Sequence, residues 1–340
     1  MTSRAHVVAA GVAVSLMIGC TDALVPRSRG VRPVELFDLV WQDFDRYYAS
    51  FEIKGVDWND VRRRFRPQAE SARTDAQIAA TIGQMLVELR DPHVDLAVPP
   101  RTFYVSLAAP RTYFDPNTTF GRYVTAGRMT PTRKIWYGMI GADLGYIRIV
   151  SFGGTGWSGE IDTAIESLQA AKAFILDVRD NGGGNDRTAE EIASRFATGR
   201  YRYAYIRYRN GPRHGDFADL IAKDIAPIGP KRFGGPVIAL TNRRAVSAAE
   251  DFVLAMRARP NTELLGDTTT GGLGNPMVRE LPNGWTFRVP QWIQYGPGME
   301  VFEGIGIGPT VVVPHSAADS AAGRDPQLEA AIARVRLRIP

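Results

Sequence analysis

Hydrophobic positions recur at regular spacing near the beginning of the chain, between residues 34 and 48. Apolar and aromatic side chains lie three or four residues apart there, as on one face of an α-helix, and residues 58–65 and 74–89 repeat the pattern. Arg90-Asp91-Pro92 ends the last helix, because proline cannot continue it. We therefore predict an N-terminal three-helix bundle over residues 33–92.

From His93 onward the pattern changes to short extended runs. Residues 94–98, 102–107, 134–137 and 145–150 are such runs, and turn residues separate them. Short runs bounded in this way are typical of β-strands. We expect a strand at each of these four places.

Helices and strands then alternate along the middle of the chain. The expected order is helix 159–171, strand 173–178, helix 188–198, strand 237–240, helix 247–257 and strand 262–265. Such alternation indicates βαβ crossovers and a partly parallel sheet, so the predicted fold class is α/β. Residues 285–312 resemble strands again, and we assign residues 316–340 to a C-terminal helical tail.

The first 19 residues are typical of a signal peptide. Arg4 supplies a positive charge, and the apolar run that follows is shorter than the about 20 residues needed to span a membrane. Cys20, the only cysteine, comes directly afterwards. Met17-Ile18-Gly19-Cys20 resembles a bacterial lipobox, although the usual leucine stands one position early. We predict a lipoprotein signal peptide over residues 1–19, lipidation at Cys20 and a tether over residues 20–32.

This N-terminus implies an exported protein, anchored by lipid at the periplasmic side of a bacterial cell envelope. An ordinary signal peptide that is cut elsewhere is the alternative. Without residues 1–19 the chain holds 40 basic and 36 acidic residues, a formal net charge of +4. This charge is too small, and basic runs too few, to indicate a nucleic-acid partner.

The amino-acid composition limits the classes of protein and the kinds of site to be considered. The chain has 340 residues, of which 44% are hydrophobic and 23% charged, as in a globular protein of one large or two modest domains. A single cysteine excludes disulfides and cysteine-rich metal sites. We expect no cofactor and no metal ion.

Ser247 stands at the most informative place in the sequence. The predicted strand 237–240 leads through a short turn into a helix that begins at this serine. A serine in such a turn exposes its Oγ and leaves neighbouring N–H groups unpaired, which suits a nucleophile beside an oxyanion hole. Ser247-Ala-Ala-Glu250 is also a capping box, and capping alone would explain both residues.

A second motif, Asp177-Val-Arg-Asp-Asn-Gly-Gly-Gly184, follows another predicted strand. Ligands and catalytic backbone gather at the carboxyl ends of such strands, and glycines allow close approach and free N–H groups. A phosphate-binding loop is the alternative. The motif lacks the Lys-Ser/Thr of a P-loop, which disfavours that alternative.

A serine nucleophile needs a base, and the chain has only four histidines. His6 lies in the predicted signal peptide, His214 in a Gly/Pro-rich loop and His315 near the tail. His93 lies at the joint between the helical bundle and the sheet, where a cleft is expected. We therefore favour His93 as the base over a purely structural histidine.

A third group should orient the imidazole of His93. Glu303 is a lone acid in an apolar, glycine-rich stretch. Asp91 and Asp95 stand beside His93 and are alternatives.

These motifs together resemble peptidase family S41, which includes C-terminal processing peptidases and the tricorn core. The resemblance covers most of residues 33–314, and six landmarks follow the family's order. They are residues 89–93, 145–152, 176–184, 240–250, 265–272 and 303–309. The resemblance implies a crotonase- or Clp-protease-like βα core with additional strands over residues 93–315.

The resemblance also implies roles for single residues. Ser247 matches the nucleophile, and the N–H of Ala248 with that of Gly182 or Gly183 matches the oxyanion hole. Processing peptidases use a lysine base in the stretch that corresponds to residues 266–274, but this stretch has no lysine here.

The tricorn-like branch uses a histidine instead, which His93 matches, and Glu303 matches the glutamate of its relay. Pro92 stands where that branch has a serine, so Asp91 is an alternative partner for His93. Too few residues separate His93 from Gly145 for a PDZ domain.

The resulting hypothesis is an exported serine peptidase that cleaves peptide or protein substrates through an acyl-enzyme at Ser247. A catalytically silent S41-like protein that binds an apolar ligand or a peptide is the first alternative. A purely structural envelope lipoprotein is the second. The substrate sequence, endo- or exo-cleavage and the oligomeric state stay open.

Overall fold

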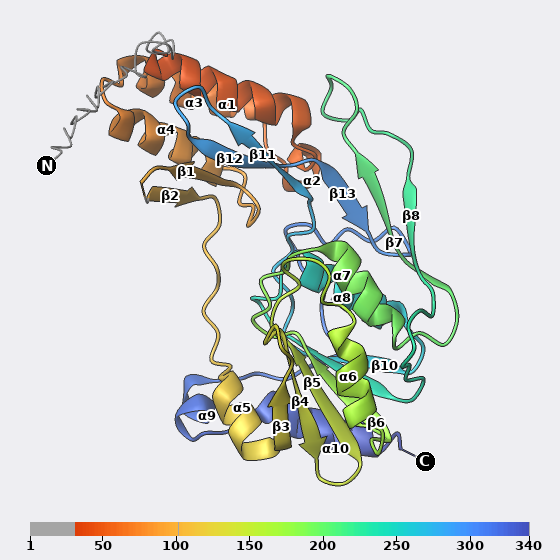
Figure 1. The fold of residues 1–340 in the computed structure, drawn as a ribbon. Coiled ribbons are helices and arrows are strands. Elements are labelled where there is room, and N and C mark those ends of the chain that lie inside the picture. Colours follow the sequence, from red (N-terminus) through yellow and green to blue (C-terminus); the bar gives the residue numbers. More distant parts are fainter. Residues whose placement is uncertain (1–30, 101, 340) are drawn as a thin grey trace, which may run out of the picture.

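The computed structural model describes residues 31–100 and 102–339 of the chain. The predicted signal peptide, Cys20 and most of the tether lie outside these residues. Within the described ranges, no helix has both the length and the apolar character to cross a membrane. Figure 1 shows a smaller helical unit above a larger core of sheet and helices.

The helical unit contains the three predicted helices and one short additional helix. Its elements are α1 (Pro33–Tyr47), α2 (Phe51–Lys54), α3 (Trp58–Ser71) and α4 (Asp75–Val87). Asp57 and Thr74 cap α3 and α4 by accepting the N–H groups of Asp60 and Gln77.

A four-stranded antiparallel sheet completes this unit, in the order β11-β12-β1-β2. Its strands are β1 (Asp95–Val98), β2 (Thr102–Val105), β11 (Pro276–Glu280) and β12 (Thr286–Pro290). Leu96, Phe287 and Val289 are buried together with the helices' apolar faces. The packed unit therefore extends beyond residue 92 and takes in four strands that lie within the predicted core, residues 93–315. Local hydrophobic patterns do not predict that strands far apart in sequence, such as β1 and β12, pair with each other.

The core is built on a seven-stranded sheet in the order β14-β10-β9-β6-β5-β4-β3. Neighbours from β14 to β5 pair in parallel, and β4 and β3 add antiparallel. This arrangement confirms the α/β class and the partly parallel sheet. The strands are β3 (Thr125–Met129), β4 (Ile135–Ile140), β5 (Leu144–Ile149), β6 (Ala173–Asp177), β9 (Val237–Thr241), β10 (Thr262–Gly266) and β14 (Val311–Val312).

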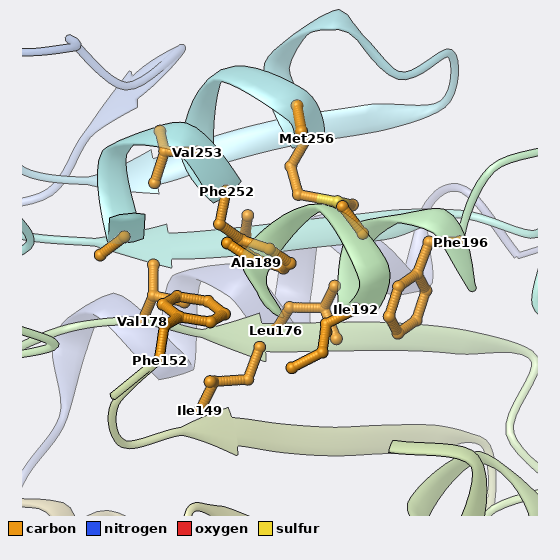
Figure 2. Close-up of a cluster of buried hydrophobic side chains, with 14 of the residues drawn as sticks. Ile149, Phe152, Leu176, Val178, Ala189, Ile192, Phe196, Phe252, Val253 and Met256 are labelled. Atoms are coloured by element: carbon orange, nitrogen blue, oxygen red, sulfur yellow. The ribbon is translucent and has the colours of Figure 1, made fainter. Parts of the chain in front are cut away.

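Helices cover both faces of this sheet. On one face, α6 (Glu160–Ser167), α7 (Asp186–Ser194) and α8 (Ala248–Ala258) pack over β5 and β6. Figure 2 shows apolar side chains of α7 and α8 that face those of β5 and β6. On the other face, Leu328, Ala331 and Val335 of α10 (Pro326–Arg336) are buried against the sheet. The C-terminal segment is helical, as the sequence predicts, with α9 (Ala317–Ala321) before α10, and α10 packs as a layer of the core. A short helix, α5 (Pro116–Tyr123), precedes β3.

A three-stranded sheet in the order β13-β7-β8 lies beside the two units (Figure 1). It consists of β7 (Tyr201–Tyr208), β8 (Ile221–Ile225) and β13 (Trp292–Tyr295). Strand β13 follows β12 of the helical unit directly in sequence, so one continuous segment runs from one unit to the other.

Candidate active site

Ser247 occupies a strained turn between β9 and α8. Its backbone has φ +63° and ψ −129°, which a residue with a side chain rarely adopts. Its N–H donates to the carbonyl of Gly272 at 3.0 Å. The N–H of Ala248 is the first of the helix and has no partner within the described part of the chain. The structure thus has the strand, turn and helix order that the sequence predicts here.

Glu250 fixes this turn to the loop that follows β10. Its fully buried carboxylate accepts hydrogen bonds from Gly271 N–H and Gly272 N–H, each at 2.8 Å, and from Thr269 Oγ1 at 2.5 Å. It also accepts from Ser247 N–H at 3.2 Å, which is the returning half of the predicted capping box. Burial raises the pKa of Glu250 to about 7, although these hydrogen bonds act in the opposite direction.

The glycine loop after β6 packs directly against the Ser247 turn. Gly183 has φ +85°, and a Cβ there would lie 2.6 Å from Val246 O and 2.7 Å from Ser247 Cβ. A side chain therefore cannot replace the glycine without moving the turn. The N–H of Gly183 donates to Asn181 Oδ1 at 2.9 Å, whereas the N–H of Gly182 has no partner among the described residues.

His93 lies in the short connection between α4 and β1. Its side chain is nearly buried, and its own N–H donates to Asp91 Oδ1 at 2.8 Å. The ring Nδ1 is buried, and it forms no hydrogen bond with any other described residue. Burial lowers the pKa of His93 to about 4, so the imidazole is neutral at neutral pH.

Gly272 contacts both the segment that carries His93 and the turn that carries Ser247. A Cβ on Gly272 would lie 2.5 Å from Pro92 Cγ, 3.0 Å from Val246 Cγ2 and 3.5 Å from His93 Nδ1. The same glycine holds the N–H of Ser247 through its carbonyl. The histidine segment and the serine turn therefore both lie against this one small residue.

His93 and Ser247 line the same cavity, whose volume is about 460 Å³. Gly182 and Ala248 also line it. Arg288 of β12 contributes a wall from the helical unit, so residues of both units surround the cavity. His214 lies elsewhere, with Nε2 2.9 Å from Asp45 Oδ1, and His315 lines a different cavity.

Glu303 lies behind this cavity. Its side chain is buried, its Oε2 accepts from Leu273 N–H at 2.9 Å, and its Oε1 is 3.0 Å from Lys54 Nζ. Burial and the charge of Asp91 raise the pKa of Glu303 to about 7. No hydrogen bond joins Glu303 to the His93 ring in this structure.

Asp91 is the acid with the most contacts to the histidine segment. It accepts hydrogen bonds from the N–H of His93 and from the hydroxyl of Tyr48, the latter at 2.7 Å. It also forms an ion pair with Lys54 Nζ at 3.1 Å. Burial alone would raise its pKa, but the charge of Lys54, the interaction with His93 and the hydrogen bond from Tyr48 together outweigh burial, and the pKa lies below its usual value. Asp95, the third acid considered, is engaged by Arg288 Nε at 2.9 Å.

The sequence analysis missed Tyr48 and Lys54. Both come from the helical unit, far from Asp91 and Glu303 along the chain, and neither lies in a recognisable motif. Pairing of Lys54 with two buried acids is visible only once the chain is folded. In the described residues, no group of three or more His, Cys, Asp or Glu side chains could hold a metal ion.

Comparison with known protein families gives two matches. The sequence model of peptidase family S41 matches residues 143–313, which include the glycine loop, Ser247 and Glu303. The model of the tricorn protease C1 domain matches residues 33–87.

Two curated relatives illustrate the similarity. The carboxy-terminal processing protease CtpA of Bacillus subtilis is 28% identical over 167 residues, covering 48% of this chain and 34% of the relative. Tricorn protease homolog 1 of Streptomyces coelicolor is 29% identical over 198 residues, covering 57% of this chain and 17% of the relative. The chain thus spans a third or less of the length of either protein.

A solved structure matches over nearly the whole chain. It is a candidate peptidase from Parabacteroides merdae, with a TM-score of 0.82 and 31% sequence identity. The match covers 90% of this chain and 97% of that protein.

Proposed function

The chain belongs to peptidase family S41, whose model matches 171 of its 340 residues, and we propose that it is a serine peptidase acting through Ser247. One observation carries this proposal. A serine in a strained strand-to-helix turn shares a cavity with a neutral, nearly buried histidine, His93. A nucleophile and a base in such proximity suit acyl transfer.

In the proposed reaction, His93 removes the proton of Ser247 Oγ as the oxygen attacks a peptide carbonyl. The resulting imidazolium then gives this proton to the departing amine, which leaves an ester on Ser247. Water, deprotonated by His93, attacks the ester and releases the new carboxyl terminus. A neutral imidazole is the form that can accept a proton, and the low pKa of His93 favours it.

The N–H groups of Ala248 and Gly182 are proposed to bind the oxyanion. Both residues line the cavity, and neither N–H is used by another described residue. Gly183 is the less suitable of the two glycines that the sequence left open, because its N–H is taken by Asn181.

Glu303 and Asp91 are proposed to support His93 rather than to react. Asp91 fixes the histidine backbone, and Glu303 fixes Leu273, which lines the cavity. The substrate is proposed to be a peptide or protein. We also infer an exported, lipid-anchored protein of the bacterial envelope, on the sequence around Cys20 alone.

Hydrolysis of a defined mixture of peptides, followed by mass spectrometry, tests the proposed function. Ser247→Ala should lower turnover by several powers of ten, because no other hydroxyl can replace the nucleophile. Its free energy of unfolding should change little, because the contact that stabilises the start of α8 joins Glu250 to the backbone N–H of residue 247, which alanine keeps. Cleavage that persists in Ser247→Ala at the wild-type rate would refute the assignment.

A further inference from the structure

Lys54 extends from the helical unit to the rear of the catalytic cavity. It is the last residue of α2, which ends because Gly55 adopts a left-handed conformation with φ +63°. The Lys54 side chain is only 5% exposed. Its Nζ lies 3.1 Å from Asp91 Oδ2 and 3.0 Å from Glu303 Oε1, and it donates to the carbonyl of Arg90 at 3.3 Å.

The charges around Lys54 are unbalanced without it. Asp91 and Glu303 are both buried, and within the described residues Lys54 is the only cation that forms an ion pair with either of them. Tyr48 donates its hydroxyl to Asp91 without carrying a charge, and burial keeps the His93 ring neutral, so neither residue replaces the cation. Two buried carboxylates without a cation would be strongly disfavoured, and at least one would take up a proton.

Each of the two acids holds a different part of the active site. Asp91 accepts the N–H of His93, which fixes the segment that carries the base. Glu303 accepts the N–H of Leu273, and the preceding Gly272 binds the N–H of Ser247 through its carbonyl. One ammonium group therefore connects the backbone on the histidine side with the backbone on the serine side.

We propose that Lys54 is a positioning residue, which holds Asp91 and Glu303 ionised and thereby fixes His93 opposite Ser247. The proposal rests on the function proposed above. Lys54 is not a second base, because a lysine base needs a depressed pKa. Here the two carboxylates raise the pKa of Lys54 although burial would lower it.

The rate at which a fluorophosphonate probe labels Ser247 reports on this positioning. Rates are measured on the full chain from pH 5 to pH 9 for wild type, Lys54→Met and Lys54→Arg. Lys231→Met is the matched control, since Lys231 pairs at 2.7 Å with Glu166 at the protein surface, away from the cavity.

Lys54→Met should slow labelling by about tenfold to a hundredfold at pH 7, the loss expected from a misplaced catalytic group. The acid side of its pH profile should move upward by about 1 to 3 units, because the acids lose their cation. Lys54→Arg should recover most of the rate, and Lys231→Met should match wild type. An unchanged rate and profile in Lys54→Met would overturn the proposal, as would failure of Lys54→Arg to recover either.

A second comparison covers the case in which Lys54→Met does not fold. Lys54→Met/Glu303→Gln removes one buried negative charge together with the cation and is compared with Glu303→Gln alone. Slower labelling and a higher acid limb in the double variant support the proposal, because Lys54 still acts on Asp91. Equal rates and profiles overturn it. A wild-type protein that is not labelled at all instead contradicts the proposed function itself.

Discussion

Two roles suit Ser247, a cap of α8 and the proposed nucleophile, and the sequence alone sets them against each other. The contact between Glu250 and the Ser247 N–H stabilises the start of α8 without using the serine hydroxyl. The cap therefore does not compete with a catalytic role for the Oγ atom. The same contact holds the serine in a backbone conformation that only its surroundings can maintain.

His93 and Glu303 should titrate in separate pH ranges. Burial lowers the pKa of His93 to about 4, so the base stays neutral until the pH falls to that region. Burial raises the pKa of Glu303 to about 7, so this acid takes up a proton near neutrality. We expect kcat/KM to fall in two steps with decreasing pH, partly near 7 and completely near 4.

Measuring kcat/KM for peptide hydrolysis between pH 3.5 and 9 checks this expectation. Glu303→Gln should lose the upper step and keep the lower one. If the upper step persists, it belongs to another group, and Glu250, whose pKa is also about 7, would be the first to test. A single step near the ordinary histidine value of 6.5 would contradict the burial of the base.

The residues of the site differ in how well the sequence identifies them. His93 and Ser247 follow from elimination and from a recognisable strand, turn and helix. Glu303 is found as a lone acid in an apolar stretch. Lys54 has no such signal, because its importance depends only on contacts made after folding.

At the scale of elements, the site depends on loops that are tied together by buried polar contacts. Glu250 of α8 accepts from three backbone N–H groups and from one threonine hydroxyl. Glu250→Gln should lower the free energy of unfolding by about 1–3 kcal/mol, because an amide NH₂ would face a backbone donor.

Chemical denaturation measures this loss, and peptide hydrolysis should fall in parallel because the 269–272 loop is loosened. Glu166→Gln, at a largely exposed position, serves as the control and should change stability little. Equal stability of the two variants would show that the Glu250 contacts contribute little to holding the loop.

Most helices and strands were predictable from the apolar pattern of the sequence, whereas some strands were not. The strand at 173–178 and the helix at 247–257 both match observed elements closely. Strand β3 was missed because all of its side chains are exposed, so it shows no alternation of apolar and polar residues. Strands β7 and β8 were missed as well.

At the scale of the whole molecule, the C-terminal helix supports the glycine loop from behind. Arg179, which follows β6, is fully buried and bonds to Asp177 and to Asp325 at the start of α10. The chain therefore uses its last helix to fix the strand end from which the proposed oxyanion hole extends.

Asp325→Ala should destabilise the protein by about 3–5 kcal/mol, because it leaves a buried guanidinium without one of its partners. Thermal and chemical unfolding of the variant measure this loss. Asp319→Ala is the control in the same segment, because Asp319 is only half-buried and caps α9 through Ser316, so its loss should cost far less. A loss for Asp325→Ala no larger than for Asp319→Ala would mean that α10 docks by its apolar face alone.

The helical unit and the core are each built from separate segments of the chain. A single boundary in the sequence therefore does not divide them. Strands β11 and β12 come from the second half of the chain and complete the sheet of the helical unit. The cavity lies where these units meet, because Arg288 of β12 lines it, while Tyr48 and Lys54 of the helical unit contact Asp91 beside His93. Strands that are so far apart in sequence, such as β1 and β12, pair only in the folded sheet, and local sequence patterns do not predict this pairing.

The most direct measurement of the central claim is covalent labelling by a fluorophosphonate, with the modified residue located by mass spectrometry. Only an activated serine hydroxyl reacts at an appreciable rate. We predict one adduct, on Ser247, that disappears in Ser247→Ala and forms far more slowly in His93→Ala. Absence of labelling in a folded wild-type protein, or an adduct at another residue, would contradict the assignment of Ser247 as the nucleophile.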